Sequence, residues 1–144
     1  MIRYLLFILF VCTSFAQVID ERLLLVETQK ILTYLDSYDQ IYSQGGEDYI
    51  IATNISNSAA RSINVVMNAY HLIHIYNFLD GEEDKLKVED YLRKQLPHTS
   101  RLLKIELGLT NGIISSARGK EIKDTTELYT SSLNFVINLL KDFT

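Results

Sequence analysis

Three residues of the chain have side chains that could bind a ligand or move a proton. His71 and His74 are three residues apart, and two imidazoles at this spacing on a helix can share a metal ion. Glu106 is a carboxylate inside an apolar stretch, so it must be paired, hydrogen-bonded or protonated if it is buried. Each residue also has a structural explanation: the histidines as ordinary helix residues, and Glu106 as a polar contact that fixes the register of packed helices.

These residues do not complete a known catalytic or metal-binding motif. The sequence has no His-Glu-x-x-His or Cys-x-x-Cys-His, and Gly119-Lys120 lacks the other residues of a phosphate-binding loop. A metal site would need further ligands, at Asp80 or Glu82. We therefore expect no enzyme activity, no metal and no cofactor, and keep a small-ligand or metal site at the two histidines and Glu106 as an alternative.

The N-terminal residues have the pattern of a secretory signal peptide. Arg3 precedes an apolar run over residues 4–12, and Ser14 and Ala16 occupy the small-residue positions of a cleavage site. We predict a signal peptide over residues 1–16 and a single domain over residues 17–144, exported to the periplasm or secreted. The chain's one cysteine, Cys12, leaves with the signal, so the exported domain must fold without a disulfide.

Composition excludes two classes of partner. The chain has 14 basic and 18 acidic residues, a formal net charge of −4, and no basic stripe. Nucleic-acid binding proteins need such a stripe to neutralise phosphates, so we expect no nucleic-acid partner. No apolar run after the signal is long enough to span a bilayer, so we expect no stable membrane insertion once the signal is cleaved.

The positions of proline, glycine and apolar residues predict long helices. Glycines at 45–46, 81 and 119 divide the domain into four segments whose apolar residues recur at helical spacing. We predict helices over 19–43 and 47–79, and a third that is either kinked at Pro97 or split into 82–96 and 98–118. A capping box of Asp124 and Glu127 predicts the start of the fourth. The expected fold is all-α, an up-down-up-down four-helix bundle.

The helical wheels give three candidate surfaces for binding another protein. The first is a strip of tyrosines on the first helix: Tyr34, Tyr38 and Tyr42. The second is a polar stripe on the second helix, nearly free of charge and bordered by His71: Asn57, Arg61, Asn64 and Asn68. The third is the apolar end of that helix: Leu72, Ile75 and Leu79. This end needs a cover, which could be the chain's own third segment, a second copy in a homodimer, or a partner protein.

The absence of a catalytic set and the three surfaces together favour a non-enzymatic function. We expect a helical bundle that binds another protein, such as an inhibitor, an immunity protein, or an accessory of envelope assembly or secretion. A bundle that binds a small ligand or a metal is the alternative.

Overall fold

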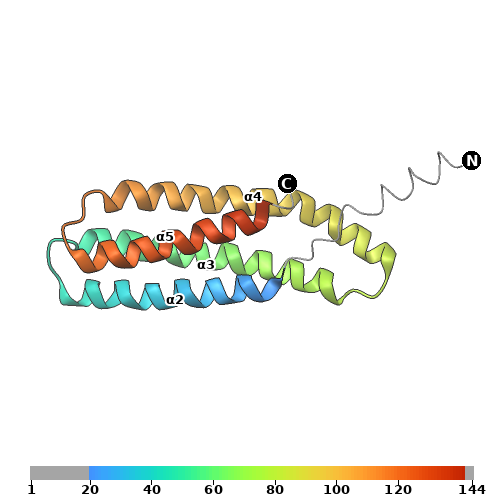
Figure 1. The fold of residues 1–144 in the computed structure, drawn as a ribbon, viewed down its shortest axis with the longest axis horizontal. Helices are drawn as coiled ribbons and strands as arrows, with labels where there is room; N and C mark the ends of the chain where they lie inside the picture. Colours follow the sequence, from blue (N-terminus) through green and yellow to red (C-terminus); the bar gives the residue numbers. More distant parts are fainter. Residues whose placement is uncertain (1–19, 142–144) are drawn as a thin grey trace, which may run out of the picture.

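The computed structural model describes residues 20–141, which form a bundle of four antiparallel helices (Figure 1). The helices are α2 (Glu21–Gln44), α3 (Tyr49–Phe78), α4 (Glu82–Ile114) and α5 (Lys120–Lys141). The prediction of an all-α, up-down-up-down four-helix bundle is confirmed. The predicted signal peptide, residues 1–16, lies outside the described residues and stays a prediction.

The helices form a closed ring in chain order. Each helix packs against the next, and α5 closes the ring against α2. The groove between α3 and α4 therefore lies on the opposite side of the bundle from the groove between α2 and α5. These two faces are called here the α3–α4 face and the α2–α5 face.

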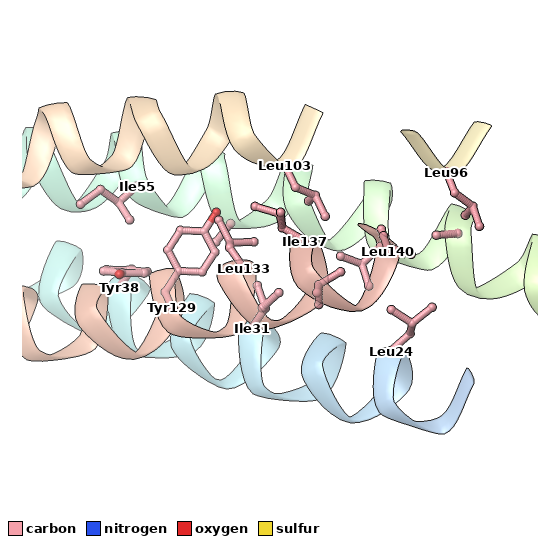
Figure 2. Close-up of a cluster of buried hydrophobic side chains, with 14 of the residues drawn as sticks. Leu24, Ile31, Tyr38, Ile55, Leu96, Leu103, Tyr129, Leu133, Ile137 and Leu140 are labelled. Carbon is pink, nitrogen blue, oxygen red and sulfur yellow. The ribbon is translucent and has the colours of Figure 1, made fainter. Parts of the chain in front are cut away.

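Apolar side chains from all four helices fill the centre of the ring. Figure 2 shows several of them, together with the rings of Tyr38 and Tyr129, which meet edge to face at 6.5 Å. Both tyrosines are fully buried. Burying a large apolar side chain stabilises a fold by about 1.5–3 kcal/mol, so this core is the main source of stability for a bundle without a disulfide.

The loops at one end of the bundle are tied together by side chains. Asp48, in the turn between α2 and α3, accepts hydrogen bonds from the backbone N–H groups of Arg118 (3.0 Å) and Gly119 (2.6 Å) just before α5. A Cβ at Gly119 would lie 2.7 Å from the Asp48 carboxylate, so a larger residue here would have to displace that carboxylate from its hydrogen bonds. Gly45, which ends α2, has a φ of 68°, a conformation that other residues rarely adopt.

Two predictions about helix boundaries are resolved by the structure. Pro97 lies inside one continuous α4, so the third segment is not split into two helices. Figure 1 shows that α4 changes direction in its first half. The capping box at Asp124 is wrong, because α5 already begins at Lys120. The residues directly before α5 are held instead by Asp48, far away in the sequence, so no local motif could reveal this contact.

The other end of the bundle is uneven. The end of α3 and the beginning of α4 extend past the beginning of α2 as a two-helix projection (Figure 1). Glu21, the first residue of α2, holds α3 at the base of this projection through His74 Nδ1 and Asn77 Nδ2, both at 2.8 Å. The projection leaves Phe78 and Leu86 largely exposed.

Candidate functional site

A groove with a volume of about 440 Å³ runs between α3 and α4 near the base of the projection. Nine residues from the two helices line it: Val65, Asn68, His71, Leu72, Tyr91, Gln95, His98, Thr99 and Leu102. Helical spacing explains why these side chains meet. The α4 residues 91, 95, 98 and 102 recur every three or four positions, and so do the α3 residues 65, 68 and 72.

The groove is apolar but also rich in hydrogen-bonding groups. Val65, Leu72 and Leu102 are apolar, whereas amides, imidazoles, a phenol and a hydroxyl supply donors and acceptors. None of the nine lining residues is Asp, Glu, Lys or Arg. Depletion of charged residues and enrichment of tyrosine are typical of the centre of protein–protein interfaces.

Exposed apolar side chains extend the groove in both directions. Ile75 follows Leu72 on the same side of α3 and is 51% exposed, and Tyr91 on α4 is 49% exposed. In the other direction Ile105 and Leu109 continue the spacing of His98 and Leu102 and are about half exposed. The α3–α4 face therefore carries a row of accessible apolar groups longer than the groove itself.

The structure places two of the predicted surfaces on this one face. Asn57, Arg61, Asn64 and Asn68 are exposed along α3, and Leu72, Ile75 and half-buried Leu79 continue that side of the helix. Asn68, His71 and Leu72 line the groove directly. The polar stripe and the apolar end are thus consecutive parts of a single surface.

The half of the groove that α4 contributes was not predicted from the sequence. Tyr91, Gln95 and His98 lie opposite the α3 residues. Their spacing of four and three residues places them on one side of a helix, and this signal was present in the sequence. It was hidden because the third segment was divided at Pro97, which separated Tyr91 and Gln95 from His98 and Leu102.

An ion pair occupies the α3–α4 face one helical turn beyond the groove. Arg61 donates two hydrogen bonds to Glu106, from Nε to Oε1 at 2.7 Å and from Nη2 to Oε2 at 2.8 Å. The Arg61 side chain is half exposed, whereas Glu106 is only 9% exposed. This two-point geometry joins α3 to α4 and holds both side chains in one orientation.

A network of hydroxyl groups continues from Glu106 into the core. Ser58 Oγ donates to Glu106 Oε2 at 2.7 Å and also lies within hydrogen-bond distance of Thr110 and Tyr129. The Tyr129 hydroxyl is 2.8 Å from Ser62 Oγ. Polar groups from α3, α4 and α5 thus satisfy one another in the interior, which fixes how these three helices align.

The network keeps Glu106 ionised. Burial alone would raise the pKa of Glu106, but hydrogen bonds from Arg61 and Ser58 and the charge of Arg61 lower it below its ordinary value. Burial raises the pKa of Tyr129, so its phenol stays neutral. A carboxylate held by these bonds serves as a structural contact, in agreement with the register-fixing explanation of Glu106.

The three predicted ligand residues lie in three different environments. His71 lines the groove, Glu106 belongs to the ion pair, and His74 is bonded to Glu21 and stacked on Tyr70 at 5.5 Å. They do not form a common site, because His71 faces the groove between α3 and α4 whereas His74 is bonded to Glu21 at the start of α2. Between residues 20 and 141 there is no group of three or more His, Cys, Asp or Glu side chains arranged to hold a metal ion.

The predicted tyrosine strip is not a continuous surface. Tyr34 borders the α2–α5 groove, Tyr38 is buried and bonded to Thr126 at 2.8 Å, and exposed Tyr42 stacks on Tyr49 at 4.5 Å. Residues four apart advance about 40° around a helix, so successive tyrosines turn from the rim into the core. Tyr38 in particular cannot contact a partner of the folded protein.

No helix within the described range is long and apolar enough to cross a membrane. No protein-family model, curated protein or solved structure matches this chain.

Proposed function

We propose that this protein is an exported, non-enzymatic helical bundle that binds another protein through its α3–α4 face. The observation that carries the proposal is the charge-free groove flanked by exposed Ile75, Tyr91 and Ile105. Apolar groups exposed in a row cost solvation free energy unless they are covered, and a row that includes a tyrosine suits a protein partner.

The shape of the face favours a helical or extended segment of the partner. A groove between two parallel ridges of side chains accepts the apolar side of an amphipathic helix, whose anchors recur every three or four residues. Leu72 and Leu102 would contact those anchors, while Asn68, Gln95 and the histidines would bond to polar groups at the edge. The Arg61–Glu106 pair and the network beneath it give the groove a fixed shape, which reduces the entropy lost on binding.

The signal-peptide pattern supports action in the periplasm or outside the cell. The partner would be a target enzyme or toxin, for an inhibitor or immunity protein, or a component of envelope assembly or secretion. Glu106 supports a binding function over catalysis, because Arg61 and Ser58 already engage both of its oxygens.

The proposal is tested by a matched pair of substitutions on α3. Ile75→Asp puts a charge on the proposed face, and Ile50→Asp puts the same charge near the start of the helix, where Ile50 is 68% exposed. The tagged protein is used to capture partners from the host's envelope and extracellular fractions. We expect a stoichiometric partner with the unchanged protein and with Ile50→Asp, and at least a tenfold loss with Ile75→Asp.

Circular dichroism and thermal melting are the controls for folding. If both variants fold and both retain the partner, the α3–α4 face is not the binding surface. If neither the unchanged protein nor Ile50→Asp captures a partner, protein binding itself is contradicted.

The volume of the groove supports a second candidate function, the binding of a small ligand. Ligand pockets have volumes of about 300–1,000 Å³, and this groove lies in that range with two imidazoles on its wall. A ligand held inside the groove would depend on His98 and Gln95 but not on Ile75, which is not among the lining residues. Thermal-shift screening of the unchanged protein and the His98→Ala variant separates this function from protein binding.

A further inference from the structure

The α2–α5 face, opposite the proposed partner-binding face, also presents an uncovered groove, with a volume of about 430 Å³. Leu23 and Val26 from α2 and Leu128 and Phe135 from α5 line it and are exposed, Phe135 by 44%. Ser131 and Ser132 lie between Leu128 and Phe135, and such small side chains let another helix approach closely. This face is an unpartnered apolar surface with its own charge pattern.

The charges in this groove form a single pair on α2. Lys30 Nζ lies 2.6 Å from Glu27 Oε1. Glu27 is 5% exposed, whereas the Lys30 side chain is half exposed. Because these two charges already pair with each other, an occupant that complements the groove is mostly apolar, and an opposite pair of charges on it would extend this ion pair.

We propose that the occupant is a second copy of this chain, packed face to face with α2 antiparallel to α2. The arrangement that places Glu27 opposite Lys30 of the second copy also places Lys30 opposite the second Glu27. The same register places apolar Leu23 opposite Tyr34 of the second copy. One symmetric contact therefore matches the charge pair and brings Leu23 onto Tyr34, as expected for a two-fold dimer.

The alignment of α2 with α5 determines where Phe135 lies in the proposed dimer. The Tyr38 hydroxyl meets the Thr126 hydroxyl at 2.8 Å, which aligns residue 38 of α2 with residue 126 of α5. Because the two helices are antiparallel, the midpoint between Glu27 and Lys30 lies beside Phe135. In the proposed dimer Phe135 is thus next to the two-fold axis, where it packs against its own counterpart and covers its exposed ring.

The alternative symmetric arrangement leaves the charges unmatched. If the two copies packed with their helices parallel, α2 would lie on α5 of the second copy. Residues 128–140 of α5 contain no charged side chain. Glu27 and Lys30, already paired with each other, would then gain no second opposite charge, whereas the antiparallel dimer brings the two pairs together as a network of four charges.

A disulfide experiment tests this register directly. Leu23→Cys and Tyr34→Cys are made separately, each with Cys12→Ser so that no other thiol is present. A disulfide needs Cα atoms within about 7 Å. In the proposed dimer, residue 23 faces residue 34 of the other copy, whereas identical residues are separated by 11 positions, or roughly 16 Å of helix. We expect covalent dimers when the two proteins are mixed under oxidation, and little from either protein alone.

Sedimentation equilibrium provides the second test. The unchanged protein should form a dimer, and Phe135→Asp should raise the dissociation constant at least tenfold by placing two carboxylates at the axis. Ile50→Asp, far from the face, should leave the constant unchanged. A monomer at every concentration overturns the proposal, and so does equal crosslinking of mixed and separate cysteine variants. The inference is independent of the proposed function, because Phe135→Asp should not alter partner capture by the α3–α4 face.

Discussion

The two opposite faces of the bundle each contain a nearly buried glutamate, and the two are held in different ways. Glu106, on the α3–α4 face, accepts three hydrogen bonds from Arg61 and Ser58 on another helix. Glu27, on the α2–α5 face, is bonded to Lys30 on its own helix. The first carboxylate fixes the geometry between two helices, whereas the second leaves a charged pair at the surface.

The two proposed binding surfaces therefore differ in how firmly their side chains are held. The α3–α4 groove has walls joined by an interhelical ion pair, and a preformed groove favours a specific partner. The α2–α5 face has an apolar surface with one local charge pair, which a second copy can complement. The predictions below test the contrast, beginning with the largest expected effect.

Removal of each glutamate is the strongest test of the contrast. Glu106→Ala leaves Arg61 and the Ser58 hydroxyl without their carboxylate, and we expect a loss of about 2 kcal/mol in the free energy of unfolding. Glu27→Ala should cost much less, because Lys30 remains accessible to water. Urea denaturation of both variants measures the difference. Equal losses would show that the two carboxylates are held equally firmly.

Removing the hydroxyl group of either core tyrosine should lower the free energy of unfolding by less than Glu106→Ala does. Tyr129→Phe leaves the buried Ser62 hydroxyl without its partner and should cost about 1 kcal/mol. Tyr38→Phe should cost less, because Thr126 keeps its bond to the carbonyl of Ile122. Thermal melting of both variants measures which one is less stable. A larger loss of stability for Tyr38→Phe would mean that the hydroxyl contact between α2 and α5 contributes more than the one between α3 and α5.

Acid should lower the free energy of unfolding through Glu106, and this effect should be smaller than those of the substitutions above. The pKa of Glu106 is lower in the folded than in the unfolded chain, so its contribution is complete above the unfolded value, about 4.3. That contribution is lost as the pH falls through the lower, folded pKa. Unfolding measured from pH 6 to pH 2 should show a steeper decline for the unchanged protein than for Glu106→Gln. Parallel curves would contradict the role assigned to this carboxylate.

The sequence predicts the helices well because their signals are local. Apolar periodicity depends on neighbouring residues, and it placed α2 and α3 within a few residues of their observed ends. The start of α5 was missed because Asp48, which holds the two residues directly before it, approaches from another turn. Such a contact exists only after the chain has folded.

The residues of the α3–α4 face were predicted in part for the same reason. Asn68, His71, Leu72 and Ile75 were recognised on α3, since they recur on one side of that helix. Their pairing with Tyr91, Gln95 and His98 depends on how α3 and α4 align, and buried Glu106 and Ser58 help to fix this alignment. Tyr38 was wrong as a partner-binding residue, because it is fully buried on the same side of α2 as Leu24 and Ile31.

Site-specific photo-crosslinking in the native host can show whether a protein partner contacts the α3–α4 face. A photoreactive amino acid is placed at Ile75, Tyr91 or Ile105 on the α3–α4 face, and at Ile50 or Leu128 away from it. All five side chains are about half exposed or more, so access to the probe is comparable. We predict that one protein partner is crosslinked from the three positions on the face and from neither control. Crosslinking of that partner from Ile50 or Leu128 instead, or of no protein from any position on the face, would contradict the account.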